Sequence, residues 1–449
     1  MALAVTDPFN KLPPEIRLRV LVSTVSKASI SHMIQASPIM LQQYLAHKGY
    51  ITRQVIAAEF DDEMIQDAMA IILLPSPRGS RKRTRRKRHS QPMRKHIRAW
   101  SKSQLPDPLK DKNEHLLSQL NKLHNQILLF VEDYITKATA SFPPREYLCL
   151  PQIKGPLTEG HLLFKGVKVT ARFNSANLTS LERKRFVKAF LVYELLCKTS
   201  DLWHVPGKLR HRKVSNAEYE GVACVHNYFC SLYGAIFAQC NDAWLPSTST
   251  GASLETGLLF PDTFYFEANA FAPDLDNIPR SDIAASFSTR GLDHLVDFLR
   301  YDFSKPDELE ELTVRLKRVW LYDEPFLSYP WAINFMLLLT SEPKYKNGCE
   351  SSMYKQLSLH PDEKLRYKIG QQRAWVFFDD SRLYPQESTE RPNFPSKTFL
   401  EEEPTKQAHV KDWFFNPQKV RTLRRSQRWH DEQIPANGSN MITPDGGNI

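Results

Sequence analysis

The chain has 449 residues, and 41% of them are hydrophobic, which is enough to build a substantial folded core. This composition excludes a largely disordered protein, and six cysteines without a Cys-x-x-Cys pair favour free thiols over a disulfide framework. The formal net charge is +10, but eleven Lys and Arg residues between positions 78 and 98 account for that excess, so the rest is nearly neutral.

The N-terminus has neither a basic flank nor an apolar run of signal-peptide length, so we expect no secretion. The longest uninterrupted apolar stretch, residues 332–339, is much shorter than the ~20 residues that span a bilayer. We therefore expect no membrane partner.

Apolar residues in the first 45 positions recur at spacings typical of three short helices. Pro14 suits the first turn of a helix that continues through Leu21, because its missing N–H is not needed there. A second helix is predicted around Ile30, and Ser37 caps a third that begins at Pro38. So small a unit is not expected to bury its own apolar stripe, which should pack on another domain or protein.

This segment resembles an F-box, whose signature is an early Leu-Pro, an acidic residue, an Ile and further aliphatic residues on three helices. The matching positions are Leu12, Pro13, Glu15, Ile16, Val20 and Leu21. The chain as a whole looks like F-box-like proteins of filamentous fungi. In the F-box family the apolar face binds the Skp-type linker subunit of an SCF ubiquitin ligase, and the rest of the chain holds a protein substrate. The resemblance implies a linker-binding face made of Leu12, Pro13, Ile16, Val20, Leu21, Ile30 and Ile34.

Ordinary helices that cap a larger domain would show the same spacing. In that alternative, Ile16 and Val20 are covered by residues beyond position 105. A docking surface requires them to be accessible instead.

Two further helices are predicted before a basic tract, around residues 51–56 and 61–74, so the F-box-like helical region covers residues 1–75. The basic residues of the tract are Arg81, Lys82, Arg83, Arg85, Arg86, Lys87 and Arg88. They have no aliphatic neighbours to bury, so residues 76–104 are expected to be a disordered linker.

Three interpretations of the tract remain open. A dense basic run suits a nuclear import receptor and predicts localisation to the nucleus, alone or together with the cytoplasm. Salt-sensitive, nonspecific binding to nucleic acid is the second interpretation. A charged spacer without a partner is the third.

Residues 105–383 predict an α-rich (α+β) main domain. A helix at 114–134 places leucines at threes and fours, and capping boxes at 179–182 and 215–218 open two more long helices. Partial alternation over 162–173, with a Lys-Gly turn, predicts a small β-hairpin. Shorter helices are expected at 292–299, 306–320 and 331–340. The predicted fold class is therefore mainly α.

Residues 384–449 are rich in proline and charge and predict a disordered, extended tail. Within this tail, four arginines share one helical face if a helix forms: Arg421, Arg424, Arg425 and Arg428. That face suits an acidic surface or nucleic acid, and a solvated face is equally consistent with the spacing.

The sequence contains no motif that indicates catalysis. Cys224, His226 and Cys230 come closest to a metal-ligand set, but their spacing favours thiols buried in a core helix. Glycine-rich phosphate-binding motifs and a Gly-x-Ser-x-Gly motif are absent from the sequence. We expect no enzyme activity, cofactor or metal, and instead an adaptor for an unidentified protein substrate. A nuclear protein associated with nucleic acid and a self-contained structural protein are the alternative hypotheses.

Overall fold

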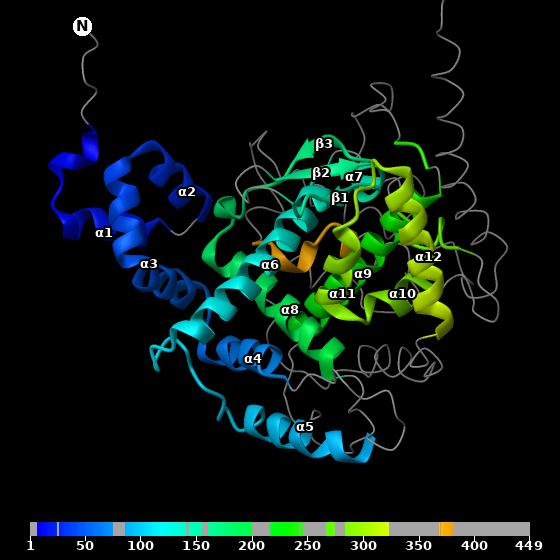
Figure 1. Cartoon of the computed structure of the whole chain (residues 1–449), viewed down its shortest axis with the longest axis horizontal. Coiled ribbons are helices and arrows are strands. Elements are labelled where there is room, and N and C mark those ends of the chain that lie inside the picture. The colour runs from blue at the N-terminus through cyan, green and yellow to red at the C-terminus, as the bar shows by residue number, and fades with distance from the viewer. Residues whose placement is uncertain are drawn as a thin grey trace, which may run out of the picture. The chain divides into compact units, whose positions relative to one another are not determined.

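The computed structural model describes residues 7–24, 27–74, 86–140, 143–154, 160–199, 216–241, 243–245, 266–273, 283–322, 368 and 370–379. They are mainly helical and carry one small antiparallel sheet, which confirms the predicted fold class (Figure 1). The helix predicted at 331–340, the tail from 384 and the capping residue Ser215 lie outside the described residues.

The chain divides into two compact units that alternate along the sequence. The first comprises Met1–Glu132, Gly155–Gly160 and Phe173–Val214, and the second comprises Asp133–Lys154, His161–Arg172 and Ser215–Ile449. The sequence pattern does not predict this alternation. Its predicted boundaries at residues 75, 104 and 383 are not the points where the two units meet.

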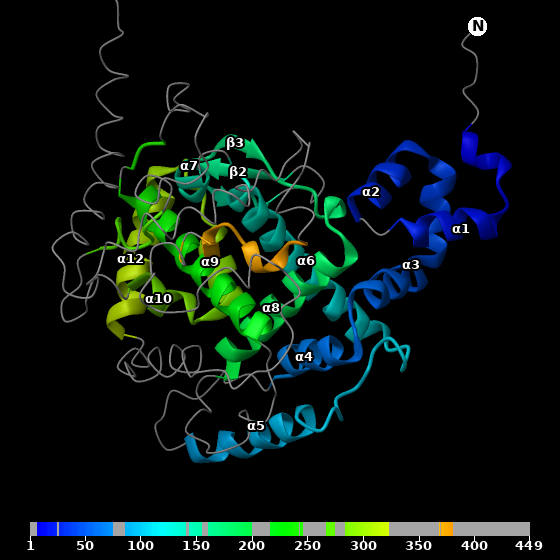
Figure 2. The same ribbon diagram turned by 180° about the vertical axis from the view of Figure 1, so that it is seen from behind.

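The described residues of the first unit form two short 3-10 helices and a series of α-helices. Its elements are η1 (Pro8–Lys11), α1 (Pro14–Ser23), α2 (Lys27–Ala36), α3 (Pro38–Glu59), α4 (Asp62–Ile72), α5 (Arg86–Trp100), α6 (Glu114–Ala138), η4 (Ser175–Asn177) and α8 (Ser180–Thr199). Helix α6 belongs to this unit as far as Glu132. Figure 2 shows the same helices from behind.

Helices α1, α2 and α3 form the predicted trio. The hydroxyl of Ser37 accepts a hydrogen bond from the backbone N–H of Met40 at 3.1 Å, which confirms Ser37 as the N-cap of α3. Helix α3 then continues through a kink at His47, where φ is −122° and ψ is 20°. The third and fourth predicted helices are thus two halves of one element.

The trio has an apolar core of its own. Leu21 of α1, Ile30 of α2 and Met40, Ile51 and Val55 of α3 are buried against one another. The expectation that so small a unit cannot bury its own stripe is therefore wrong in part, because α3 is long enough to pack against both α1 and α2. Only the faces turned away from this core remain to be covered.

Buried polar contacts tie the second half of α3 to α6 and α8. The carboxylate of Glu59 lies 2.6 Å from Nε2 of His124 on α6 and 3.6 Å from Nε of Arg183 on α8. Thr179 and Glu182 exchange the two hydrogen bonds of a capping box, at 2.9 and 3.2 Å, as predicted for the start of α8. The trio is therefore joined to the rest of its unit through one end of α3.

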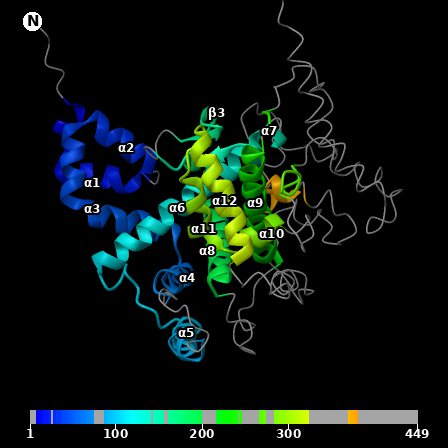
Figure 3. The same cartoon turned by 45° about the vertical axis from the view of Figure 1, so that its right-hand side comes forward.

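Residues 76–104 are not a disordered linker throughout. Residues 75–85 lie outside the described part of the chain, but Arg86–Trp100 form helix α5, which lies along α4 (Figures 1 and 3). The expectation of disorder was wrong here because the end of the tract carries His96, Ile97 and Trp100. These three side chains are partly buried, and two of them bond to α4.

The second unit combines a small sheet with helices. Its elements are α7 (Pro143–Tyr147), β1 (Leu150–Pro151), β2 (His161–Phe164), β3 (Val167–Ala171), α9 (Asn216–Cys240), α10 (Ile283–Ser288), α11 (Gly291–Leu299), α12 (Pro306–Tyr322) and η10 (Trp375–Phe377). The strands are antiparallel in the order β1-β2-β3. Strands β2 and β3 are the predicted hairpin, and their turn places Lys165 and Gly166 at positive φ, 47° and 82°. Glycine suits the second of these positions because it lacks a Cβ.

Helix α9 is the core helix of this unit. Among the described residues, its segment Glu220–Cys240 is the one that is long and apolar enough to cross a membrane, but 83% of its most apolar window is buried in the fold. Burial of this extent is typical of a core helix.

A short late segment of the chain is also buried in the second unit. The hydroxyls of Tyr134 and Tyr147 donate to the backbone carbonyls of Gln371 and Gln372, the second at 2.6 Å. The guanidinium of Arg373 donates to two carbonyls at and just beyond the end of α6, at 3.0 and 2.9 Å. These contacts fix the segment that leads into η10.

Candidate partner-binding surface

Helices α1 and α3 leave several large apolar side chains accessible to solvent. Ile16 on α1 is 43% exposed, and Leu41, Leu45 and Tyr50 on α3 are 40%, 63% and 46% exposed. Pro13, at the start of α1, is exposed as well. We call Pro13, Ile16, Leu41, Leu45 and Tyr50 the exposed apolar set.

Helical geometry explains why these residues are not in the core. Ile16 is five residues before the buried Leu21, so it lies about 140° around α1 from the face that packs inward. Leu41 and Leu45 are four residues apart and share a face of α3. Helices α1 and α3 therefore each have apolar residues in the core of the trio and further apolar residues exposed to solvent.

The predicted linker-binding residues fall into three groups. Pro13 and Ile16 are exposed, and Leu12, Val20 and Ile34 are half-buried. Leu21 and Ile30 are only 0% and 5% exposed, because they form the core of the trio. Their assignment to a docking face is corrected, since a partner could reach them only by opening the trio.

The sequence left two arrangements open for Ile16 and Val20: an accessible face, or a face covered by residues beyond position 105. Ile16 is accessible among the described residues, and Val20 is half-buried against the core of the trio itself. Neither observation fits a face sealed by residues beyond position 105. Ile16 is thus accessible to solvent without any rearrangement of the described residues.

Sequence reasoning did not place Leu41, Leu45 and Tyr50 in the site. The signal that could have found the first two was present, since their four-residue spacing puts them on one helical face. Tyr50 had no such signal. It follows the kink at His47, whose position the sequence does not reveal.

The segment that forms the trio has a net positive charge. From Asp7 to Tyr50 it carries the basic residues Lys11, Arg17, Arg19, Lys27 and Lys48 and the acidic residues Asp7 and Glu15. This excess of three positive charges favours a partner with an acidic surface, because complementary charge speeds and orients association.

Asp7 fixes the start of the trio onto α3. Its carboxylate accepts hydrogen bonds from the hydroxyl of Ser37 at 2.5 Å and from the backbone N–H groups of Phe9 and Ile39 at 3.0 and 3.4 Å. The bond from Ser37 is the main cause that holds the pKa of Asp7 below its usual value. These hydrogen bonds hold the segment that precedes α1 at the start of α3.

The basic tract is placed only in part. Arg81, Lys82, Arg83 and Arg85 lie outside the described residues, whereas Arg86, Lys87 and Arg88 belong to the first turn of α5. Further along α5, Arg94, Lys95 and Arg98 are exposed. The second half of the tract is thus an ordered basic helix.

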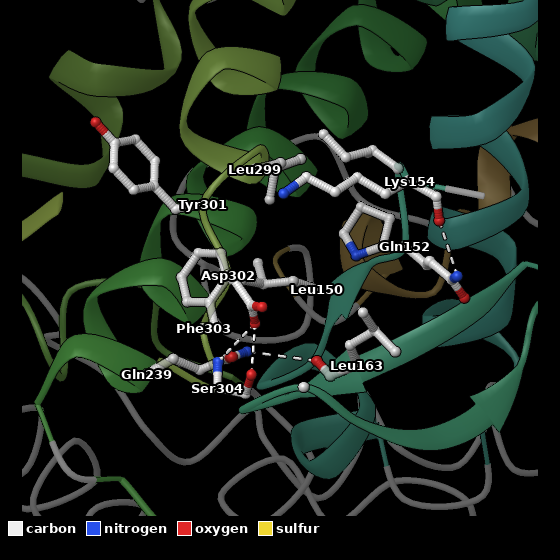
Figure 4. Close-up of a pocket in the computed structure, with 13 residues that line it drawn as sticks. Leu150, Gln152, Lys154, Leu163, Gln239, Leu299, Tyr301, Asp302, Phe303 and Ser304 are labelled. Carbon is white, nitrogen blue, oxygen red and sulfur yellow. Dashed lines mark hydrogen bonds between the residues drawn. The ribbon is translucent and has the colours of Figure 1, made fainter. Parts of the chain in front are cut away.

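The second unit contains a hollow of about 290 Å³ between the sheet and the connection from α11 to α12 (Figure 4). Its polar side chains serve mainly to hold neighbouring loops. Gln239 donates to the carbonyls of Leu148 and Leu163, and Asp302 accepts from the backbone and hydroxyl of Ser304. Because the same carboxylate oxygen of Asp302 accepts from both the backbone N–H and the hydroxyl of Ser304, this pair forms a local turn contact.

The buried histidines and thiols of the second unit fit a structural role. Burial raises the pKa of Cys230 to about 12 and of Cys240 to about 11, so both thiols stay protonated. Burial also lowers the pKa of His226 to about 4. Cys230 lies 3.7 Å from His226, but the described residues contain no group of three His, Cys, Asp or Glu side chains that could hold a metal.

Two surfaces in the described part of the chain therefore stand out: the exposed apolar set on α1 and α3, and the basic side of α5. In the hollow of the second unit, Gln239 and Asp302 are instead engaged in hydrogen bonds with neighbouring residues. Comparisons with models of protein families, with curated proteins and with solved structures found no match to this chain.

Proposed function

We propose that this protein is a non-catalytic adaptor, similar to the F-box substrate receptors of SCF ubiquitin ligases. Its helical trio would bind the Skp-type linker subunit, and the rest of the chain would hold an unidentified protein substrate. The observation that carries the proposal is that the trio is already folded around its own core and still exposes Ile16, Leu41, Leu45 and Tyr50.

The energetic argument rests on those exposed side chains. Burying one aliphatic side chain of this size is worth ~1.5 to 3 kcal/mol, so a partner that covers several of them gains a substantial binding free energy. Because Leu21 and Ile30 already stabilise the trio, a bound partner would bury the exposed apolar set without requiring the trio to unfold.

The joint between the trio and the rest of its unit also supports an adaptor. Arg53 of α3 forms an ion pair of 2.6 Å with Glu114 of α6, and Glu59 bonds to His124. A linker subunit bound to the first half of α3 would be held at a defined position relative to α6 and α8. An adaptor needs such a fixed connection because it must present its substrate in a constant orientation.

A binding experiment with two matched double variants tests the proposal. Ile16→Asp with Leu45→Asp places two charges in the exposed apolar set, whereas Leu181→Asp with Val314→Asp changes two similarly exposed residues, 57% and 49%, outside it. We expect the first variant to weaken binding to a purified Skp-type linker subunit by about 100-fold or more, since each lost contact is worth more than a tenfold change. The second variant should bind like the wild type.

Both variants must first show the far-ultraviolet circular dichroism and melting temperature of the wild type, which separates lost docking from lost folding. Undiminished binding by a folded Ile16→Asp, Leu45→Asp variant would reject the assignment of the surface. If the wild-type chain binds no linker subunit at micromolar concentrations, the adaptor proposal itself fails.

A further inference from the structure

We propose that helix α5 is a second binding surface, which lies across the phosphate backbone of double-helical nucleic acid. The surface consists of Arg94, Lys95 and Arg98, which are exposed on this helix. It is separate from the exposed apolar set and does not depend on linker binding.

One side of α5 is docked on α4. Nε2 of His96 donates to the carbonyl of Ala70 at 2.9 Å, and Nε1 of Trp100 donates to Oδ1 of Asp67, also at 2.9 Å. His96 and Trp100 are four residues apart, so they mark a single face of the helix. The chain just after α5 is held as well, since Gln66 exchanges two hydrogen bonds of 3.0 Å with the backbone of Leu105.

The opposite side of α5 carries the charge. At 100° per residue, Arg98 lies about 160° around the helix from both His96 and Trp100, and Arg94 lies about 160° from His96 and about 120° from Trp100. Lys95 lies beside them. All three are exposed. The docking thus turns a run of basic residues, which in a free chain would point in all directions, into one ordered cationic face.

The surroundings of this face favour phosphate as the ligand. No acidic residue occurs from Arg78 to Pro106, so the cations are not neutralised by neighbours in sequence. Asp62 and Asp107, two acidic residues outside α5, form ion pairs with Lys110. A row of cations with no acidic residue nearby in the sequence suits a polyanion, from which it releases condensed counterions.

Two features favour a duplex over a single strand. Single-strand binding relies on exposed aromatic rings that stack on bases, but Trp100, the one aromatic residue of α5, is partly buried with its N–H bonded to Asp67. Base reading in the major groove requires a helix to enter it deeply. Because α4 covers one side of α5, contacts with the backbone are favoured over contacts with base edges, and binding should not depend on sequence.

Fluorescence anisotropy with the full chain and labelled 25-base-pair DNA duplexes of two unrelated sequences tests this inference between 50 and 200 mM KCl. The wild type should bind both duplexes equally, with log K falling by about 2.7 or more per decade of salt for at least three phosphate contacts. Arg94→Gln, Lys95→Gln, Arg98→Gln should reduce that slope by about 2.7 and weaken binding at least tenfold at 50 mM salt.

A triple variant with the same change in net charge serves as the control. Arg19→Gln, Lys48→Gln, Lys122→Gln removes three exposed cations of the first unit outside α5 and should leave affinity and slope nearly unchanged. Arg94→Lys with Arg98→Lys should keep both as well, because phosphate contact needs the charge and not the guanidinium.

Several results would overturn the inference. They are an unchanged salt slope in the α5 variant, an equal loss in the control variant, and tighter binding to a single strand of the same sequence than to the duplex. Capture of a purified import receptor through Arg94, Lys95 and Arg98, without any duplex binding, would also overturn it in favour of a protein partner.

Discussion

The indole N–H of Trp100 and the carboxylate of Asp67 are joined by a hydrogen bond of 2.9 Å, and the carboxylate is almost completely buried. This bond holds the C-terminal end of α5 on α4. We predict that Trp100→Phe, which keeps the ring but removes the donor, lowers the free energy of unfolding of the first unit by about 1.5 to 3 kcal/mol, as is typical of a lost bond to a buried charge. Urea denaturation measures the loss.

Hydrogen exchange locates that change. The amides of α5 should exchange faster in Trp100→Phe, whereas those of α1 and α2 should not change. Asp67→Asn keeps an acceptor for the indole and should therefore release α5 less than Trp100→Phe does. Equal protection of α5 in the wild type and in Trp100→Phe would contradict a holding role for this bond.

Core residues and exposed residues of the trio should differ in their effect on stability. Leu21→Ala removes a completely buried side chain and is expected to lower the free energy of unfolding by about 2 to 5 kcal/mol. Ile16→Ala changes an exposed residue, so its effect on stability should stay within about 0.5 kcal/mol. Thermal denaturation compares the two, and the reverse order would refute the division between core and surface.

Two glycines should respond to alanine in opposite ways. A Cβ at Gly234 of α9 would lie 2.5 Å from the carbonyl oxygen and 2.7 Å from the Cα of Ala268, so the backbone must move and we expect a loss of about 1 to 3 kcal/mol. At Gly49 of α3 the new Cβ would meet only the flexible carboxylate of Glu114, at 3.0 Å. There, the better helix propensity of alanine should add up to about 1 kcal/mol. Chemical denaturation of both variants checks the contrast.

Burial of His226 predicts an acid-sensitive second unit. Its pKa is lowered to about 4 in the folded chain, so unfolding allows a proton to bind below the ordinary value of 6.5. The free energy of unfolding therefore falls as the pH drops from 7 towards 4, by about 2 kcal/mol between pH 7 and 5 for this one residue. His294, whose pKa is lowered to about 3 by burial and by Arg290 and Arg315, adds a loss of the same sign.

The histidine contribution is isolated by substitution. Urea denaturation of His226→Gln at pH 7 and pH 5 should show a smaller loss between the two values than the wild type does, because glutamine does not titrate. An identical loss in both proteins would show that His226 is not the source.

Local signals predicted the helices and the hairpin well. Ser37 and the Thr179–Glu182 capping box act at short range, so the atoms that fix these helix starts are all close together in the sequence. The Lys165–Gly166 turn is equally local, because positive φ is needed at two successive residues. Such features can be recognised from a few consecutive residues of the sequence.

Features that depend on distant partners were missed. Helix α5 lies in a tract whose charge suggests disorder, and its order depends on Asp67 and Ala70 of α4. The burial of Leu21 likewise follows from the length of α3, which the kink at His47 obscures. A sequence shows which residues are apolar or charged, but not which of two apolar faces meets the core.

The late segment around Gln371 has a consequence for synthesis. Tyr134 and Tyr147 leave the ribosome more than 200 residues before the carbonyls of Gln371 and Gln372 that accept their hydroxyl hydrogens. The first unit is complete in sequence at Val214, whereas the interior of the second must wait for nearly the whole chain. A message truncated before the codon for Gly370 would thus yield a complete first unit and a second unit that lacks part of its interior, and chaperones and proteases act on incompletely folded chains of this kind.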